Sequence, residues 1–408
     1  MRSTKWTGVA LATLLAACAD GPIASRPLHG LPRALTAAEQ KVVAGSNGFA
    51  FGLLRTAPAR QGNVFVSPLG VSMALGMAMS GARGATRDEM GGTLGFAGMS
   101  PQEVDGAYRS LIDLLLGLDG TTDVRLASSV WYRQGFPFDA AYLDATRASF
   151  GAQVTALDFG DPAARDRINA WVREGTGGKI PGIVDGISAD QVMFLVNAVY
   201  FKGRWAARFD RAATRDQPFH RTDATTATVP MMSREGTYAM ASGAGWQALD
   251  LPYGNGAFSM TVVLPAQGTS AAALAARMDA AAWDSLTAAL RPTQVMVKLP
   301  RFRIDYGSDL AGPLQELGMR RAFTGGGADF TGMSASRGHE LFISAVQHRT
   351  FVDVDEEGTE AAAATSVGVN VTSLPPSFVV DRPFLVAIRE RFSGTILFLG
   401  RIEDPRQS

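Results

Sequence analysis

The sequence is poor in the residues that most often form covalent links and metal sites. Its 408 residues include one cysteine and four histidines. A single cysteine has no partner for an intramolecular disulfide. The histidines are far apart, and His339 with Glu340 lacks the second histidine of the H-E-x-x-H zinc motif. We therefore expect no metal site and no cofactor.

The charge of the chain indicates no polyanionic partner. It has 38 basic and 38 acidic residues, so its formal net charge is zero. Only five of the basic residues are lysines, and they are scattered along the chain. A neutral chain without a basic stripe lacks the electrostatic footprint of a nucleic-acid-binding protein. We expect no binding to nucleic acid.

Two common motifs of serine enzymes are also missing. The nucleophile elbow G-x-S-x-G does not occur, and its nearest approach surrounds Ser72 in a segment that reads as a buried helix. No lysine has a serine three positions before it, so the S-x-x-K motif of penicillin-recognising enzymes is absent too. An exported hydrolase is therefore the weakest of the functional hypotheses.

The N-terminal segment has the character of an export signal. Arg2 and Lys5 precede an apolar stretch, residues 6–17, that is too short to cross a bilayer as a mature helix. Its last residues and the next one, Leu-Ala-Ala-Cys, resemble a bacterial lipobox, in which the cysteine (here Cys18) is lipidated and becomes the new N-terminus. An ordinary signal peptide or a buried core cysteine is the alternative interpretation.

These features divide the chain into three segments. Residues 1–17 are predicted to be a lipoprotein signal peptide, and residues 18–35, rich in Pro, Gly and Ala, a flexible tether. Residues 36–408 are predicted to form the folded domain. We expect an exported protein held on a membrane by the lipid at Cys18, on the periplasmic or cell-surface side, or an extracellular protein if the anchor is not used.

The folded part reads as a mixture of helices and strands around a large core, with 46% hydrophobic residues. Thr36 and Glu39 form a capping-box pattern, and Ser67 followed by Pro68 is typical of a helix start. Further helical periodicity covers residues 104–116, 140–147, 163–173 and 271–290. Strand patterns cover residues 192–201, 258–264, 295–304, 341–354, 383–388 and 395–402.

One more segment has the alternation of a half-buried strand. Between Thr359 and Val371 the odd positions are Thr, Ala or Val, whereas the even positions include Glu360, Ser366 and Asn370. All of its side chains are small or β-branched except for Glu360 and Asn370. Such a strand could enter a sheet between two existing strands with little displacement of the core. An ordinary edge strand or an Ala-rich loop is the alternative interpretation.

Ordered motifs along the chain are similar to those of the serpin family. They are NVFVSP at 63–68, GARGAT at 81–86, NAWVREGTGGKI at 169–180, NAVYFKGRW at 197–205, LPRF at 299–302 and the signature DRPFLVAIRERFSGTILFLGRIEDP at 381–405. The resemblance covers essentially residues 36–408. It implies an α+β fold of one large domain with three β-sheets, eight or nine helices and an exposed reactive-centre loop at about residues 356–378.

The loop segment resembles the hinge of inhibitory serpins. The matching residues are Glu356, Glu357, Gly358, Thr359, Glu360, Ala361, Ala362, Ala363, Ala364 and Thr365. A charged or bulky side chain at Thr359 would oppose insertion, because that position is the first to be buried. The resemblance therefore implies a monomeric suicide inhibitor of serine proteases and not an enzyme. A non-inhibitory serpin with a binding, storage or chaperone role is the main alternative.

Family spacing places the reactive bond between Thr372 and Ser373. The residues around this bond that would set specificity are Val369, Asn370, Val371 and Leu374. No Lys or Arg occurs between Thr359 and Asp381, which argues against proteases with an acidic primary pocket. Elastase-like or subtilisin-like targets are favoured, papain-like cysteine proteases remain possible, and Val371 is the alternative cleavage residue.

The resemblance also implies five residues that control the opening of the main sheet. Ser67, Asn197 and His348 match a polar cluster beneath the sheet, where Gly70 replaces a serine that is often present. Glu356 would pair with Arg301 at the root of the loop, with Trp205 packed nearby. The alternative interpretation of Ser67, Asn197 and His348 is a helix cap, a core amide and a strand histidine.

Overall fold

The computed structural model describes residues 27–188, 191–359 and 376–406, and within them the chain forms nine α-helices and two β-sheets. The helices are α1 (Ala37–Thr56), α2 (Pro68–Gly81), α3 (Gly84–Leu94), α4 (Pro101–Leu116), α5 (Ala140–Phe150), α6 (Ala163–Gly175), α7 (Ala271–Arg277), α8 (Ala280–Ala289) and α9 (Ala311–Glu316). Three short 3₁₀ turns are η1 (Arg211–Ala213), η2 (Arg321–Phe323) and η3 (Gly338–Glu340). The mixed α+β fold class is confirmed.

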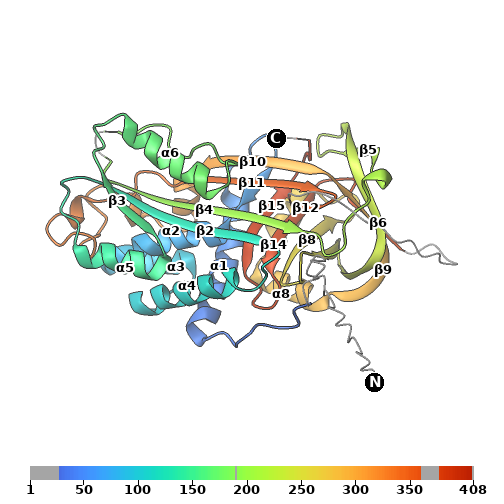
Figure 1. Cartoon of the computed structure of the whole chain (residues 1–408), viewed down its shortest axis with the longest axis horizontal. Coiled ribbons are helices and arrows are strands. Elements are labelled where there is room, and N and C mark those ends of the chain that lie inside the picture. Colours follow the sequence, from blue (N-terminus) through green and yellow to red (C-terminus); the bar gives the residue numbers. More distant parts are fainter. Residues whose placement is uncertain (1–26, 189–190, 360–375, 407–408) are drawn as a thin grey trace, which may run out of the picture.

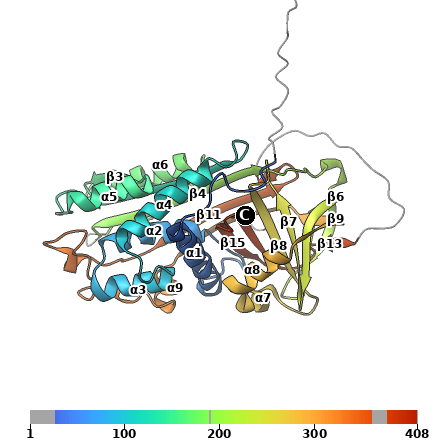
Figure 2. The ribbon, with the colours of Figure 1, turned by 90° about the horizontal axis from the view of Figure 1, so that it is seen from below.

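The first sheet has six strands in the order β10-β11-β12-β4-β2-β3. Their bounds are β10 Phe302–Asp309, β11 Gln347–Asp355, β12 Gly358–Thr359, β4 Met193–Arg204, β2 Asp123–Arg133 and β3 Gln153–Leu157. Helix α6 covers one face of this sheet and α2 the other (Figures 1 and 2). Because both faces are covered, β4 carries the nearly unbroken apolar run that predicted a central strand.

The second sheet has nine strands, in the order β1-β15-β14-β8-β7-β6-β9-β13 with β5 paired to β6. Their bounds are β1 Val64–Val66, β5 Arg215–His220, β6 Thr226–Gly243, β7 Trp246–Pro252, β8 Phe258–Pro265, β9 Arg291–Pro300, β13 Ser377–Val379, β14 Phe384–Glu390 and β15 Ile396–Ile402.

The described residues thus form two sheets where three were expected. Strand β6 is 18 residues long, and it pairs with β5 near its start, with β9 through its middle and with β7 near its end. One long strand therefore makes hydrogen bonds in what would otherwise be two separate sheets, and joins them into one. Composition and local periodicity do not report such a shared strand.

The predicted helix starts are present. Thr36 and Glu39 form the reciprocal capping box at the start of α1, and the Ser67 hydroxyl accepts a hydrogen bond from Gly70 N–H at the start of α2. Helix α2 is buried around nearly its whole circumference, as its apolar sequence predicted.

Three predicted segments differ in their extent. The helical pattern over 271–290 is two helices, because Asp279 accepts a hydrogen bond from Ala282 N–H and starts α8. The strand predicted over 295–304 is interrupted at Arg301, whose N–H donates to Pro230 O. The strand predicted over 341–354 begins only at Gln347.

Residues 27–35 lie against the folded body, although they were predicted to belong to a flexible tether. Leu28 N–H donates to Asn255 O at 2.8 Å, and Arg33 donates to both carboxylate oxygens of Glu39 at 2.8 and 2.5 Å. The Arg33 guanidinium holds the pKa of Glu39 at about 2, against the desolvation of this buried carboxylate. The docked part of the chain therefore includes Leu28, eight residues before Thr36. No helix within the described ranges is long and apolar enough to span a bilayer.

Candidate functional site

Strand β12 is a two-residue strand held between two long ones. Gly358 pairs with Arg204 of β4 on one side, and with Asp355 on the other. Thr359 pairs with Gly203 and with Val354 of β11. The start of the predicted hinge therefore already forms a central strand of the six-stranded sheet.

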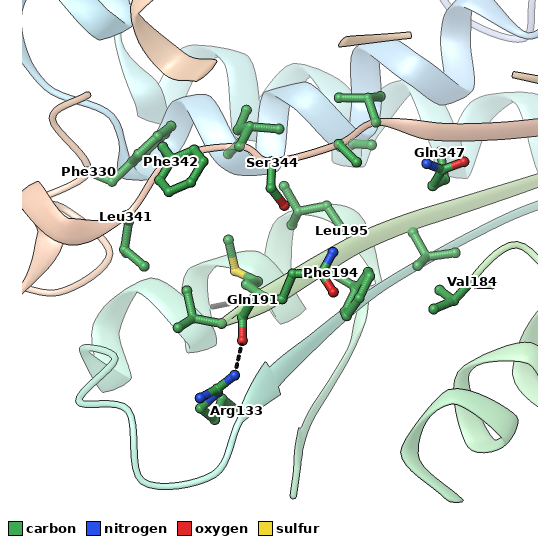
Figure 3. A pocket seen from close by; sticks show the side chains of 18 of the residues that line it. Arg133, Val184, Gln191, Phe194, Leu195, Phe330, Leu341, Phe342, Ser344 and Gln347 are labelled. Atoms are coloured by element: carbon green, nitrogen blue, oxygen red, sulfur yellow. Dashed lines mark hydrogen bonds between the residues drawn. The ribbon is translucent and has the colours of Figure 1, made fainter. Parts of the chain in front are cut away.

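Beyond β12, the edges of β4 and β11 face each other, and the seam between these two edges is called the slot below. Across the described residues these two strands form no ladder with each other, although Figure 1 shows them running along one another. At the far end of the slot lies a cavity of about 390 Å³ between residues 191–196 and 341–347. Figure 3 shows Phe194 and Leu195 of the β4 segment on one wall, and Phe342 and Ser344 on the opposite wall.

Glycine is required at Gly358, where the hinge enters the sheet. Its φ of +147° is a conformation that side-chain-bearing residues rarely adopt. A Cβ atom at Gly358 would lie 2.1 Å from the carbonyl oxygen of Gly203, and one at Gly203 would lie 2.8 Å from the ring of Tyr253. The backbones of β12 and β4 can approach this closely because Gly358 lacks a side chain, whereas the absence of a side chain at Gly203 leaves room for the rings of Tyr253 and Phe201.

The Thr359 side chain lies in a closed polar and aromatic seat. It is 3% exposed, and its hydroxyl is 2.9 Å from the hydroxyl of Tyr253. The Tyr253 ring stacks on Trp205, with centroids 4.5 Å apart and planes at 10°. Thr359 therefore points toward the core, as the predicted alternation required of the odd positions.

Two carboxylates fix the root of the loop. Arg301 donates to Glu356 at 2.8 and 2.5 Å, and the Thr214 hydroxyl donates to the same oxygen. Burial acts to raise the pKa of Glu356, but the hydrogen bonds from Arg301 and Thr214 outweigh it and keep the pKa below its ordinary value. Arg208 pairs with the neighbouring Glu357 at 3.1 Å.

Trp205 connects this root to β12 through the backbone. Its indole N–H donates to Asp355 O and its backbone N–H donates to Glu357 O, each at 2.9 Å. The pairing of Glu356 with Arg301 and the nearness of Trp205, both implied by the family resemblance, are thus present as geometry. Their control over sheet opening stays a prediction.

The polar cluster beneath the sheet is only partly connected. Ser67 N–H donates to His348 Nε2 at 3.1 Å, whereas Asn197 Nδ2–H donates to the Ser128 hydroxyl at 2.9 Å. No hydrogen bond joins Asn197 to Ser67 or His348 among the described residues, and Asn197 Oδ1 has no hydrogen-bond partner. Burial lowers the pKa of His348 to about 4, so this imidazole is neutral at pH 7.

Sequence reasoning missed the residue that contacts the hinge most directly. Tyr253 follows β7 and is 106 positions from Thr359, so no local pattern connects the two. Ser128, Thr214 and Arg208 were missed for the same reason. Tyr253 lies in the short segment Pro-Tyr-Gly-Asn-Gly, which predicts a turn between two strands. The segment does not indicate which distant residue Tyr253 contacts.

Several predicted residues lie outside the described residues. They are Cys18, the hinge positions Glu360, Ala361, Ala362, Ala363, Ala364 and Thr365, the specificity residues Val369, Asn370, Val371 and Leu374, and the reactive bond Thr372–Ser373. Among the residues that are described, no group of three or more His, Cys, Asp or Glu side chains is placed to hold a metal ion.

Comparison with known proteins connects this geometry to one family. The family model of serpins, described as serine protease inhibitors, matches residues 44–405. The chain is 37% identical over 361 residues to the leukocyte elastase inhibitor of Bos taurus, which covers 84% of this chain and 93% of that protein. It is 35% identical over 379 residues to an uncharacterised serpin-like protein of Thermococcus kodakarensis, which covers 90% of this chain and 87% of the relative.

Solved structures give the same assignment. The native state of the thermophilic serpin tengpin matches with a TM-score of 0.83 at 25% identity, over 94% of this chain and 97% of tengpin. Human thyroxine-binding globulin, solved as a complex with thyroxine, matches with a TM-score of 0.83 at 29% identity, over 91% of this chain and all of that chain.

Proposed function

This chain belongs to the serpin family, a family of protease inhibitors and not of enzymes, and on that premise we propose that it traps serine proteases as a monomeric suicide substrate. The single observation that carries this proposal is β12. Its two residues, Gly358 and Thr359, already occupy the top of the slot between β4 and β11. The residues that follow have the alternation needed to extend this strand down the slot.

In the proposed reaction the target protease supplies the nucleophile. Its serine hydroxyl attacks the carbonyl carbon of Thr372 and gives its proton to the protease's own base, which passes a proton to the nitrogen of Ser373. The bond from that carbon to that nitrogen breaks, and Ser373 leaves with a new amino group. The protease is then joined to Thr372 as an acyl ester. Water would complete the hydrolysis unless the protease active site is distorted first.

Loop insertion provides that distortion. A strand running from Thr359 to Val371 is about 43 Å long at about 3.3 Å per residue, so the tethered protease would be carried across most of the inhibitor. Roughly a dozen new ladder hydrogen bonds at about 0.5 to 1.5 kcal/mol each give on the order of 10 kcal/mol. Catalytic geometry tolerates only small displacements, so this free energy is enough to stop deacylation.

Elastase-like and subtilisin-like proteases are the favoured targets. Thr372, Val371 and Val369 suit small aliphatic pockets, and the segment contains no basic residue before Arg382. The relatives named leukocyte elastase inhibitors support this choice. Papain-like cysteine proteases are a second class of target, since they also form an acyl-enzyme.

Incubation with pancreatic elastase, followed by denaturing gel electrophoresis, tests the proposal. We expect an adduct that survives SDS, and a Thr359→Arg variant that is cleaved without forming it, because a charged side chain cannot enter the seat beside Tyr253. Wild-type protein that is only cleaved by elastase and by subtilisin, with no adduct to either, contradicts the proposal.

A non-inhibitory binding protein is the second candidate function. The observation that favours it is the close structural match to thyroxine-binding globulin, which was solved with its ligand. The two functions differ in the fate of the loop. An inhibitor forms the adduct, whereas a binding protein is cleaved as an ordinary substrate.

We also propose that the chain is exported and lipidated at Cys18. The supporting sequence is the charged and apolar lead that ends in Leu-Ala-Ala-Cys. In a bacterium that makes lipoproteins, the full chain should incorporate labelled palmitate and sediment with membranes, and a Cys18→Ala variant should do neither. Unlabelled wild-type protein released into the medium contradicts the anchor and favours an extracellular inhibitor.

A further inference from the structure

One buried carboxyl group among the helices takes no part in the hinge. Asp105 lies on α4 and is 9% exposed, and its Oδ1 atom has no hydrogen-bond partner. A buried carboxylate without a partner is unfavourable, because it has lost its hydration and gained no hydrogen bond in return. The neighbouring groups therefore decide whether Asp105 is more stable as a carboxylate or as a carboxylic acid.

The neighbour of opposite charge directs its hydrogens elsewhere. Arg87 of α3 attracts Asp105 through its charge, but its guanidinium donates to Met79 O at 3.3 Å and to Met99 O at 2.8 Å. These carbonyls belong to the end of α2 and to the segment just before α4. Among the described residues, Arg87 thus bonds to the main chain and forms no ion pair with Asp105.

The other neighbour, Ser80 of α2, presents an acceptor. Its Oγ lies 3.1 Å from Gly76 O and 3.1 Å from Met77 O, so its single hydrogen is directed to its own helix. Only the lone pairs of this oxygen remain for Asp105. A carboxylate can only accept hydrogen bonds, whereas a carboxylic acid has an O–H that can donate. Ser80 and Asp105 therefore match only when Asp105 carries a proton.

The elements packed on α4 are α1, α2, α5 and β2, and Arg87 reaches it from α3. On α5, burial raises the pKa of Tyr142, and its hydroxyl donates to Met77 O at 3.1 Å. The side chains that bond elsewhere, or that act on Arg87 and not on Asp105, are Tyr108 of α4, Lys41 of α1, Arg125 of β2, and Arg83 and Asp88 beside Arg87. Arg87 and Ser80 are thus the side chains that act on the protonation of Asp105.

Burial is the main cause that raises the pKa of Asp105 from 3.8 to about 6, and the charge of Arg87 offsets only part of it. The folded chain therefore binds more protons than the unfolded chain between these values. The stability that Asp105 contributes is full below about pH 4 and is lost as the pH rises through 6. His348 acts in the opposite direction, because burial lowers its pKa.

We propose that Asp105 is a proton-sensitive contact between α4 and α2, ionised at neutral pH and donating to Ser80 Oγ once mild acid has protonated it. The proton comes from the solvent, and the O–H···O hydrogen bond is the one new contact. Helix α2 also packs on β4. The contact therefore holds the helices more firmly against the main sheet in acid than at neutral pH.

Titration of the Asp105 carboxyl carbon by NMR, with the signal assigned through its backbone, tests the proposal. We expect a midpoint near pH 6 in the wild type. Ser80→Ala removes the acceptor of the acid's proton, so it should lower the midpoint by about half a unit or more. Ser285→Ala is the matched control, since Ser285 donates in the same way to its own helix, but on α8.

Three results of this titration overturn the proposal. One is a wild-type midpoint near 4. Another is a midpoint that Ser80→Ala raises or leaves unchanged, because a serine that donates to the carboxylate would produce a rise. The third is an equal shift in Ser80→Ala and Ser285→Ala.

Urea unfolding at several pH values gives a second measurement. Asp105→Asn has no charge, and its amide N–H can donate to Ser80 at every pH. We expect its unfolding equilibrium constant to be lower than that of the wild type by about tenfold or more at pH 7.5, and this advantage to shrink as the pH falls toward 4.5. An advantage that does not depend on pH contradicts the proposal. If Asp105→Asn does not fold, the serine variants decide alone.

The proposal is independent of protease inhibition. Neither measurement involves a protease or cleavage of the loop. An inhibitor with an Asp105 midpoint near 4 would contradict only the proton-sensitive contact, and a non-inhibitor with a midpoint near 6 would contradict only the proposed function.

Discussion

The two edges of β4 differ sharply in how their backbone groups are used. Along one edge, ten residues from Met193 to Lys202 pair with β2. Along the other edge, within the part of the chain that the structure describes, only Gly203 and Arg204 pair, and both pair with β12. Buried backbone N–H and C=O groups nearly always have hydrogen-bond partners. A strand edge in the middle of a sheet that is paired at one end only can therefore accept an additional strand. If the proposed function holds, we therefore expect the hinge to be the part of the molecule most sensitive to substitution.

The largest expected effect is a loss of adduct formation, caused by a substitution that prevents β12 from pairing with β4. A Gly358→Val substitution places Cβ 2.1 Å from the Gly203 carbonyl oxygen at a φ of +147°, so β12 cannot form as it does now. We expect adduct formation with elastase to fall at least about tenfold, a change of about 1.4 kcal/mol or more in the barrier to trapping. Gel titration of adduct against cleaved inhibitor measures this change.

Gly135→Ala is the matched control for this substitution. Gly135 also has a positive φ, of +84°, but a Cβ atom there would meet no other atom within 4 Å. Its inhibition should match that of the wild type. A Gly358→Val protein that forms adducts as efficiently as Gly135→Ala would show that the two-residue strand is irrelevant to trapping.

The next effect concerns the root of the loop. Arg301→Gln removes the cation that pairs with Glu356 and leaves a buried carboxylate with weaker partners. We expect a loss of about 1 to 2 kcal/mol in the stability of the intact protein, below the range for fully buried pairs because Arg301 is 41% exposed. Denaturant unfolding measures it. Arg349→Gln, which breaks the pair with Asp305 at the other end of the sheet, is the comparison.

If the root pair matters for the hinge, Arg301→Gln should also speed proteolysis of the loop, and Arg349→Gln should not. Equal rates for both variants would mean that the pair of Arg301 with Glu356 only adds stability.

A smaller effect is expected from Tyr253→Phe. This change removes the hydroxyl that contacts Thr359 and keeps the ring that stacks on Trp205. We expect a loss of about 1 kcal/mol of local stability at β12, seen as faster hydrogen exchange at Thr359 N–H. Tyr306→Phe is the control, because its hydroxyl donates to Pro58 O away from the hinge. If the rate of hydrogen exchange at Thr359 N–H is unchanged in Tyr253→Phe, the Tyr253 hydroxyl does not stabilise β12.

A separate effect, absent at pH 7, is the dependence of stability on pH at His348 of β11. Burial lowers the pKa of His348 to about 4, whereas an unfolded histidine has a pKa near 6.5. The unfolded chain therefore binds more protons between these values, so the stability contributed by neutral His348 is present above about pH 6.5 and is lost as the pH falls toward 4.

A His348→Gln variant should show a shallower loss of stability between pH 6.5 and 4 than the wild type, as measured by urea unfolding at each pH. Its amide oxygen can still accept from Ser67 N–H. If His348→Gln does not alter how the free energy of unfolding changes with pH, other titratable groups cause the pH dependence.

The sequence predicted what depends on neighbours along the chain. The capping box of Thr36 and Glu39, the buried helix after Ser67 and the central strand β4 all follow from local patterns, and all are present. The pair of Glu356 with Arg301 was anticipated only through the family resemblance, since 55 positions separate the two residues.

Contacts made by tertiary packing could not be predicted. The seat formed by Tyr253 depends on a turn that is distant in sequence from the hinge, and the docking of Leu28 on Asn255 depends on the shape of the folded surface. The junction of two expected sheets depends on the length of β6, whose pairing changes partner along its course. Local patterns report which residues are buried, but not which distant residues they meet.

Calorimetry of the intact and the loop-cleaved protein tests the central claim most directly, namely that the unpaired edge of β4 is reserved for the chain's own loop. About 10 kcal/mol of new strand pairing, divided by an unfolding entropy of about 2 cal/mol/K per residue, gives a rise in Tm on the order of 10 °C after cleavage. A Tm that is the same or lower after cleavage would contradict the account.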